Sequence, residues 1–303
     1  MPTLPDLPPI AQGPLSVVLF ATPENASAAR LRSWLEWLDA RGGESELILV
    51  VDGPLAAEQT LPTHPRLRLL QHDKPQGEGR ALRTGLLATT HPLVAYAPCH
   101  EDYKPEHVQM LLDRRVPAEA LVGTPREGQS EVREIDLVHL LSGYRAGVPM
   151  PLLPRLLGAL WRLLCRVVFN YPPVRLPGWL GLRRHLAWLG LRFVFALRYH
   201  DPLCPVRLFR REMLHRLPLQ SRTAFVHVEL LAKANFLGKI FGAEQVPLPV
   251  VPPKDRGDAG ALWRDMQRVM NQPDFGPAIV PPEAILPDSP VGPTPPQNPA
   301  PAT

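Results

Sequence analysis

Acidic residues are missing from one long part of this 303-residue sequence: no Asp or Glu occurs from Leu137 to His200. Nine arginines fall in the same stretch, so the modest net charge of +4 conceals a strongly basic segment. A basic segment of this kind suits an anionic partner. Trp and Leu dominate it, rather than Lys, Asn and Ser, which argues against nucleic acid as that partner.

Long uninterrupted apolar runs are also missing. An arginine interrupts the apolar sequence every few positions between 151 and 200, so no run reaches the roughly 18 residues that a membrane-spanning helix requires. Arg155, Arg162 and Arg166 recur at helical spacing among Leu and Trp, which predicts a basic amphipathic helical segment over 126–200. Its helices either pack on the core with their Arg heads in water or lie on an anionic membrane surface. The lack of acidic residues favours the membrane surface.

Cysteine is scarce as well. Cys99, Cys165 and Cys204 make an odd number and have no CxxC spacing, which argues against a disulfide framework and against a structural zinc site. The first residues, MPTLPDLPPIAQGP, contain no basic region followed by an apolar one, so we expect no secretory signal. We therefore expect a cytoplasmic protein that is peripheral at the membrane.

Proline, by contrast, is abundant: the sequence contains 39, concentrated near its two ends. Segments of this composition rarely bury enough apolar surface to fold. We therefore predict that 1–14 and 272–303 are disordered.

The first part of the chain alternates apolar strand-like runs with helix-like segments. This alternation predicts an α/β fold with a mostly parallel sheet and helices on both faces. Ligands bind such a sheet at the carboxyl ends of its strands. Polar groups follow three of the runs, namely Glu24, Asp52 and the cluster His100, Glu101 and Asp102, and we expect them to converge. The predicted strands are 15–21, 46–53, 66–72 and 93–97, and the predicted helices are 26–42, 79–90 and 105–115.

Several segments, taken in order, resemble family 2 glycosyltransferases, in particular the dolichyl- or polyprenyl-phosphate mannosyltransferase-like branch. The resemblance covers roughly residues 15–255 and implies a GT-A fold. Such a fold binds a nucleotide sugar at the carboxyl edge of its sheet, usually with Mg²⁺ or Mn²⁺, and passes the sugar to a lipid phosphate or another acceptor. The segments are SVVLFATPEN, ELILVVDG, HDKPQGEGRALRTGL, LVAYAPCHEDYKPEHV, DPLCPVRLFRREML and FVHVELLAKANFLGKIFGAEQVPLPV.

This interpretation divides the chain into parts with different expected roles. They are a disordered segment (1–14), a nucleotide-sugar-binding half (15–125), the basic amphipathic segment (126–200), an acceptor-side half (201–255), a C-terminal helix (256–271) and a Pro-rich disordered tail (272–303).

The resemblance implies a set of donor-binding residues. Glu24 matches the end of the family's Pro-x-Tyr-Asn-Glu pattern, and Asp52 matches a carboxylate that grips the base or ribose. An ordinary Asp-Gly turn is the alternative for Asp52. Gly77 and Gly79 match a Gly-x-Gly that opens a helix and lets its N–H groups face the ligand. Contacts to the phosphates are expected from Arg80, Arg83 and Lys254, although the two arginines are equally typical of a solvated surface.

The family's metal-binding Asp-x-Asp is altered in this sequence. Pro98 and His100 stand at the positions of its two aspartates, with Cys99 between them. Proline cannot bind a hard cation and imidazole suits one poorly, so a role for Mg²⁺ or Mn²⁺ is doubtful. Asp102 and Glu101 are weak candidate ligands, ahead of His100. Basic residues that replace the metal, or a surface loop without function, are the alternatives.

The segment DPLCPVRLFRRE matches the family's acceptor side. The resemblance implies that Asp201 acts near the acceptor, as a base or a positioning group, together with Arg207. An N-cap or a salt bridge to a nearby Arg is the alternative for Asp201. Arg126 and Arg210 are expected to bind an anionic acceptor group. Glu229 is expected to pair with a basic group near the crevice rather than act as a base.

Two functions follow from these residues. One is a glycosyltransferase that moves a sugar from a nucleotide-sugar donor to a lipid-phosphate or other acceptor at the cytoplasmic membrane face. The other is an inactive GT-A protein that binds a nucleotide, a lipid or a protein partner. The joint presence of Glu24, Asp52, Asp201 and the RLFRRE segment favours the enzyme. An unrelated α/β nucleotide-binding enzyme does not explain the match in the second half.

Overall fold

The computed structural model describes most of the two predicted halves and little of the basic segment between them. Predictions for Arg126, Lys254, the chain ends and most of 126–200 lie outside the described residues. The described residues are 13–122, 140–146, 160, 163–164, 167–168, 190–191, 193–197, 199–236, 244–250 and 259–275.

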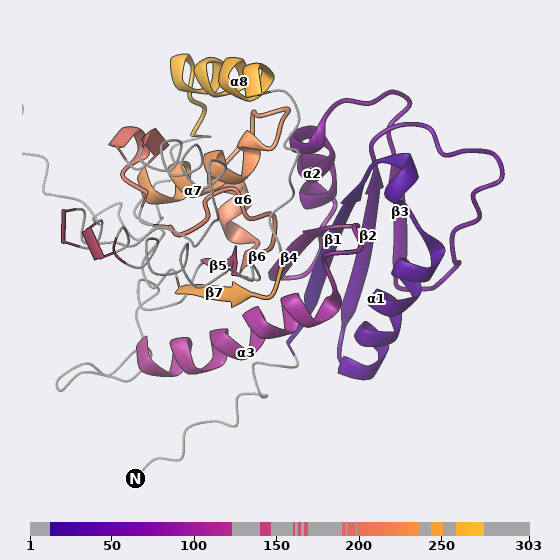
Figure 1. Cartoon of the computed structure of the whole chain (residues 1–303). Helices are drawn as coiled ribbons and strands as arrows, with labels where there is room; N and C mark the ends of the chain where they lie inside the picture. Colours follow the sequence, from indigo (N-terminus) through magenta and orange to yellow (C-terminus); the bar gives the residue numbers. More distant parts are fainter. Residues whose placement is uncertain are drawn as a thin grey trace, which may run out of the picture.

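The centre of the fold is one mixed sheet whose described strands run in the order β3-β2-β1-β4-β6-β5-β7 (Figure 1). Four of the strand pairs are parallel, and β6 is antiparallel to both of its neighbours. The predicted mostly parallel sheet is thus confirmed. The strands are β1 Leu15–Ala21, β2 Ser45–Val51, β3 Leu67–Gln71, β4 Leu93–Pro98, β5 Leu140–Arg145, β6 Arg207–Arg210 and β7 Glu244–Leu248.

Helices cover both faces of this sheet, as predicted from the alternation of the sequence. The three helices expected in the first part of the chain are present. The first two lie within three residues of their predicted bounds, and the third begins as predicted but continues seven residues further, to Val122. The described helices are η2 Pro23–Asn25, α1 Ala28–Arg41, α2 Glu78–Leu87, α3 Pro105–Val122, α6 Glu212–Arg216, α7 Phe225–Phe236 and α8 Ala259–Asn271.

The strands β1, β2 and β4 have continuous apolar sequences because both of their faces are buried. All seven residues of β1 are buried, and successive side chains of a strand point to opposite faces. Val17 and Leu19 therefore join one core cluster with Trp34 of α1. Val18 joins the other with Leu82 of α2 and residues of α7. A continuous apolar run, rather than an alternating one, is the pattern of such a doubly covered strand.

The strand directions bring distant segments to one edge. β1, β2 and β4 are parallel, and two antiparallel steps through β6 give β5 the same direction. Their carboxyl ends therefore share one edge of the sheet, and the amino end of β6 joins them. In the part of the chain that the structure describes, no helix has the length and apolarity needed to cross a bilayer.

Candidate functional site

A cavity of about 430 Å³ lies at this carboxyl edge, a size typical of small-molecule sites. The convergence expected from the sequence holds in part: Asp52, His100 and Asp102 line the cavity, whereas Glu24 and Glu101 do not. The lining consists of Phe20, Ala21, Thr22, Asn25, Asp52, Glu78, Ala81, Pro98, Cys99, His100, Asp102, Tyr103, Arg145, Leu203, Pro205, Ala224, His227 and Leu262.

Asp52 lines the cavity, but the protein itself engages its carboxylate. Oδ1 accepts hydrogen bonds from the Gln76 backbone N–H at 2.7 Å and contacts His72 Nδ1 at 2.8 Å. Oδ2 accepts from the Gly77 N–H at 2.8 Å. His72 in turn contacts Thr84 Oγ1 at 3.0 Å. Asp52 therefore fixes the loop that leads into α2, which is a larger structural role than the simple Asp-Gly turn given as the alternative.

Gly77 and Gly79 allow a close approach of two backbones. A Cβ at Gly77 would lie 2.2 Å from the Arg222 carbonyl oxygen, and one at Gly79 would lie 2.2 Å from that of Ser221. The Gly77 N–H donates to Asp52 and the Gly79 N–H donates to the Arg222 carbonyl. The two N–H groups expected to face a ligand thus bind protein groups. The physical reason for these glycines is the packing of the 221–222 loop.

The loop after β4 lies where the resemblance places the metal motif. Its Cys99 N–H donates to the Phe20 carbonyl, which ties the loop to the end of β1. His100 Nδ1 and Asp102 Oδ2 are 3.2 Å apart, and both side chains are exposed. Cys99 is buried and its thiol is free, and burial raises its pKa. Cys204 is also a buried free thiol, as the cysteine pattern predicts.

Arg145 and Asp201 form a buried ion pair beside the cavity. The guanidinium binds the carboxylate through two hydrogen bonds, of 2.5 and 2.7 Å. Burial alone lowers the pKa of Arg145, but the charge and hydrogen bonds of Asp201 outweigh it and the pKa rises. Arg145 lines the cavity, while Asp201 supports it from behind. The structure therefore contains a salt bridge between Asp201 and an arginine, which was one of the alternatives for this residue.

Several predicted residues lie away from the cavity lining. Arg80 and Arg83 are exposed on α2. Arg207 is wholly buried and donates to the carbonyls of His227 and Pro202, so it supports the wall without facing the cavity. Arg210 pairs in the sheet with Leu93, at the amino end of β4. Leu93 lies five residues before the lining residue Pro98, about 16 Å away at 3.3 Å per residue. That position does not suit the predicted acceptor contact.

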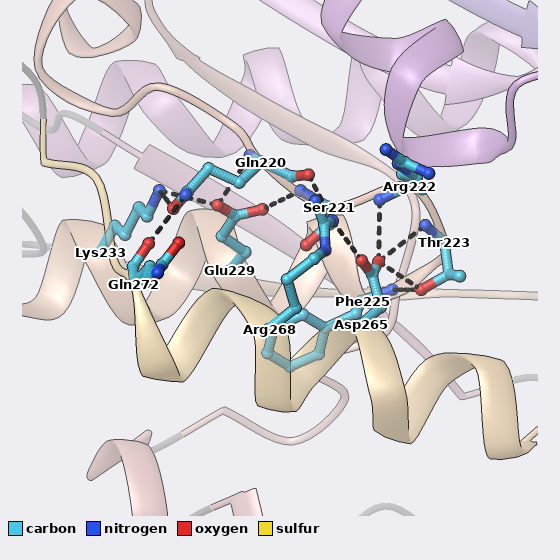
Figure 2. A network of polar contacts seen from close by, with 10 residues as sticks. All are labelled: Gln220, Ser221, Arg222, Thr223, Phe225, Glu229, Lys233, Asp265, Arg268 and Gln272. Carbon is cyan, nitrogen blue, oxygen red and sulfur yellow. Dashed lines mark hydrogen bonds and ion pairs between the residues drawn. The ribbon is translucent and has the colours of Figure 1, made fainter.

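Residues 220–223 are joined to α7 and α8 by a polar network, shown in Figure 2. Glu229 accepts hydrogen bonds from the backbone N–H groups of Gln220 and Ser221, at 2.9 Å each, and pairs with Lys233 at 2.7 Å. The predicted pairing of Glu229 with a basic group is confirmed, but neither Glu229 nor Lys233 lines the cavity. Asp265 of α8 accepts from the N–H groups of residues 222 and 223. The loop that packs on Gly77 and Gly79 is thus held from two sides.

Sequence reasoning missed Glu78, His227 and Arg145, which line the cavity. Glu78 lies between the two glycines of the Gly-x-Gly pattern, so its position was the available signal. His227 lies in a helix whose apolar sequence indicates a core element. Arg145 lies in a strand that the sequence did not predict. Their relation to the cavity depends on contacts far apart in the chain.

Solved structures, rather than sequences, resemble this chain. No family model matches it, and no curated protein matches it significantly. A crystal structure of glucosyl-3-phosphoglycerate synthase from M. tuberculosis is similar with a TM-score of 0.51 and 20% identity, over 86% of this chain and 81% of that one.

A second structure of that mycobacterial enzyme, in complex with Mn²⁺, UDP-glucose and phosphoglyceric acid, has a TM-score of 0.50 and 18% identity, over 88% of this chain and 83% of that one. At such identity the likeness shows the fold, and the fold alone. The chain therefore has the predicted GT-A-type fold, while the polyprenyl-phosphate mannosyltransferase branch is not confirmed.

Proposed function

We propose that this protein transfers a sugar from a nucleotide-sugar donor to an acceptor that carries an anionic group, a lipid phosphate being the acceptor we favour. The observation that carries this proposal is the cavity at the carboxyl edge of a GT-A-type sheet, where Asp52, Asp102 and Arg145 come together. The donor would lie along this edge, with its nucleoside near the ends of β1 and β2. Its diphosphate would lie at the loop after β4, and its sugar would point toward Arg145.

The charge of the lining bears on how a diphosphate is bound. Arg145 is the only Lys or Arg among the described lining residues, and Asp201 neutralises it. Asp52, Glu78 and Asp102 add negative charge. A diphosphate therefore requires a cation from elsewhere, either a divalent metal ion or a residue outside the described parts, such as Lys254.

His100 and Asp102 suit a divalent metal in part. They present one nitrogen and one carboxylate to the cavity, 3.2 Å apart, but no group of three or more candidate ligands occurs among the described residues. Diphosphate oxygens and water would have to complete the shell of Mg²⁺ or Mn²⁺. A metal bound there would neutralise the charge that develops on the leaving phosphate. Asp102 would then be the principal protein ligand, because its oxygen is harder than imidazole nitrogen.

The ion pair between Arg145 and Asp201 bears on the chemical nature of the acceptor. Both carboxylate oxygens of Asp201 accept hydrogen bonds from Arg145, so this carboxylate is poorly placed to remove a proton from a hydroxyl. An acceptor that is already an anion requires no deprotonation, and positioning suffices. This favours a lipid phosphate over a neutral sugar hydroxyl. Asp201 would then orient Arg145 toward the acceptor.

A lipid acceptor agrees with an exposed apolar face in the basic segment. Leu160, Leu163, Leu164, Val167 and Val168 are 50–76% exposed and recur at the spacing of one helix face. Because this stretch of the sequence contains arginines and no acid, the partner that suits it is an anionic lipid surface. We propose peripheral attachment to the cytoplasmic membrane face through these residues.

The second candidate is a GT-A protein that binds a nucleotide sugar without transferring it. Pro98 at the position of a metal-binding aspartate favours this alternative, since it removes one hard ligand. A thermal-shift screen against UDP-, GDP- and dTDP-sugars, with and without Mn²⁺, separates the candidates when it is followed by an assay of transfer to polyprenyl phosphate. Transfer supports the proposal, and a donor-specific shift without transfer or hydrolysis supports the alternative. No shift with any donor overturns both.

A further inference from the structure

Glu78, His227 and Tyr96 form a chain of hydrogen bonds beside the cavity, although they come from α2, α7 and β4. His227 Nε2 lies 2.9 Å from Glu78 Oε1, and His227 Nδ1 lies 3.2 Å from the Tyr96 hydroxyl. The Tyr96 and His227 rings are stacked, with centroids 5.7 Å apart. Both rings are almost fully buried. Arg207 donates to the His227 carbonyl and so fixes the backbone that carries the imidazole.

The burial of these groups determines where the protons lie. Burial raises the pKa of Tyr96 and lowers the pKa of His227, so the phenol keeps its proton and the imidazole is neutral at neutral pH. We assign the Tyr96 O–H as the donor to Nδ1 and the Nε2–H as the donor to Glu78, which is the arrangement that satisfies both contacts. The chain thus ends on a carboxylate that is oriented by a buried donor.

Glu78 is the carboxylate at this end of the cavity with surface left for a ligand. Its side chain is 34% exposed and lines the cavity at the first turn of α2, where a negative charge is favourable. Both oxygens of Asp52 already accept hydrogen bonds from the protein. Asp102 lies on the loop after β4 and pairs with His100. A ligand that approaches the β1 and β2 end therefore meets the Glu78 carboxylate.

The surroundings of Glu78 suit a flat aromatic ring. Phe20, Ala81 and Leu262 line the same cavity with apolar side chains, and α2 packs on β1 and β2. Under the proposed function, the nucleoside of the donor occupies this end. Apolar lining together with one oriented carboxylate is the combination that recognises a nucleobase by stacking and by one directed hydrogen bond.

We propose that Glu78, positioned by His227 and Tyr96, selects the donor nucleobase by accepting a hydrogen bond from a ring N–H. This inference rests on the proposed nucleotide-sugar function. Uracil, thymine and guanine present a ring N–H on their pairing edge, whereas cytosine and adenine present a ring nitrogen lone pair there. A carboxylate directed at the ring nitrogen attracts the first group and repels the lone pair of the second, whose exocyclic amines it reaches only from a shifted position. Tyr96 and His227 are positioning residues in this assignment, because they act through Glu78.

Calorimetric titration with UDP, GDP, CDP and ADP, at one Mn²⁺ concentration, tests the assignment on the full chain. We expect UDP or GDP to bind the wild type at least about tenfold more tightly than CDP and ADP, the value of one hydrogen bond to a charged group. The UDP and GDP arms decide which base is preferred. Glu78→Gln should reduce the preference to about twofold or less, since an amide both donates and accepts. Glu36→Gln, an exposed change on α1, is the matched control and should leave the preference unchanged.

Tyr96→Phe tests the positioning role, because it keeps the ring volume and removes the O–H that fixes the imidazole. We expect a partial loss of the preference, of about threefold, without loss of folding. A wild type that binds UDP and CDP equally, or a Glu78→Gln variant with the wild-type preference, overturns the inference and leaves the proposed function standing. A wild type that binds none of the four nucleotides overturns both.

Discussion

The Asp201 carboxylate receives two hydrogen bonds from Arg145, a residue 56 positions earlier in the chain, through Nε at 2.5 Å and Nη2 at 2.7 Å. The pair joins the end of β5 to the loop before β6. Because the Arg145 side chain is 3% exposed and the Asp201 side chain is 12% exposed, neither charge has much access to water. Each group therefore depends on the other.

Removal of the Asp201 charge should strongly destabilise the protein. Asp201→Asn leaves the Arg145 guanidinium buried without a counter-charge, which costs about 3 kcal/mol in the free energy of unfolding. Urea denaturation followed by circular dichroism measures this loss. Asp113→Asn, on the exposed face of α3, is the control and should change stability by less than about 0.5 kcal/mol. Equal stability of the two variants would show that the pair is dispensable.

Substitution of two glycines by alanine separates the steric cost of a new Cβ from the conformational cost of a positive φ. Gly79→Ala places a Cβ 2.2 Å from the Ser221 carbonyl oxygen, so the 221–222 loop must move, at a cost of about 3 kcal/mol. Gly42→Ala has no atom within 4 Å of the new Cβ, but its φ of 69° and ψ of −176° form a conformation that is essentially restricted to glycine, and it should cost about 2 kcal/mol. Thermal unfolding compares them. Donor binding should fall in the first variant alone, and a reversed order of stabilities would contradict this account.

Stability should depend on pH through Asp265 of α8. Burial alone raises the pKa of this carboxyl, but hydrogen bonds from Thr223, Arg268 and Arg222 outweigh it and lower the pKa below its ordinary value of 3.8. A depressed folded pKa gives stability that is complete above the unfolded pKa and is lost as the pH falls through the folded pKa.

Asp265→Asn should therefore cost about 2 kcal/mol at pH 7, and its difference from the wild type should shrink below about pH 4. Urea denaturation at pH 7, 5, 4 and 3 gives the profile. If the stability difference between the two proteins stays constant from pH 7 to pH 3, ionisation of Asp265 does not contribute to the pH dependence of stability.

Metal dependence should pass through Asp102. Donor binding measured in EDTA and in millimolar Mn²⁺ should be stronger with the metal, and Asp102→Ala should abolish that gain, because it removes the carboxylate ligand in the lining. Glu101→Ala is the control, since Glu101 is exposed and outside the lining. Binding that is indifferent to metal in both proteins would instead support a fixed cation such as Lys254.

Membrane binding should depend on the exposed apolar face and on the arginines. Leu163→Ser with Val167→Ser should reduce co-sedimentation with vesicles that contain anionic lipid at low salt, without loss of stability, because these side chains are already 59% and 76% exposed. Leu87→Ser, at a 67% exposed position on α2, should have no effect. Replacement of Arg155, Arg162 and Arg166 by Glu should also release the protein, since each arginine contributes about 1 kcal/mol at such a surface. A wild type that does not sediment with the vesicles would exclude this attachment.

The architecture of the first half was predictable because its signals are local. Continuous apolar runs such as LSVVLFA form strands that helices cover on both sides, and all seven of those residues are buried. β5 was not predicted, because LLSGYR contains Ser142 and Gly143, which weaken a strand pattern. Gly143 leaves room there for the Leu248 side chain of β7, which would have to shift to accept a Cβ at 2.4 Å.

The sequence by itself predicted the strands and helices of the first half and the carboxyl edge as the place of the cavity, because both follow from local patterns. The altered Asp-x-Asp at Pro98 and His100 is what the family resemblance implies. Only the tertiary structure decided which charges meet. Asp201 binds Arg145 across 56 positions, and Glu78 binds His227 across 149. Such pairings depend on strand order and helix packing, and no local pattern carries them, because a buried charge takes the partner that the fold brings within hydrogen-bonding distance.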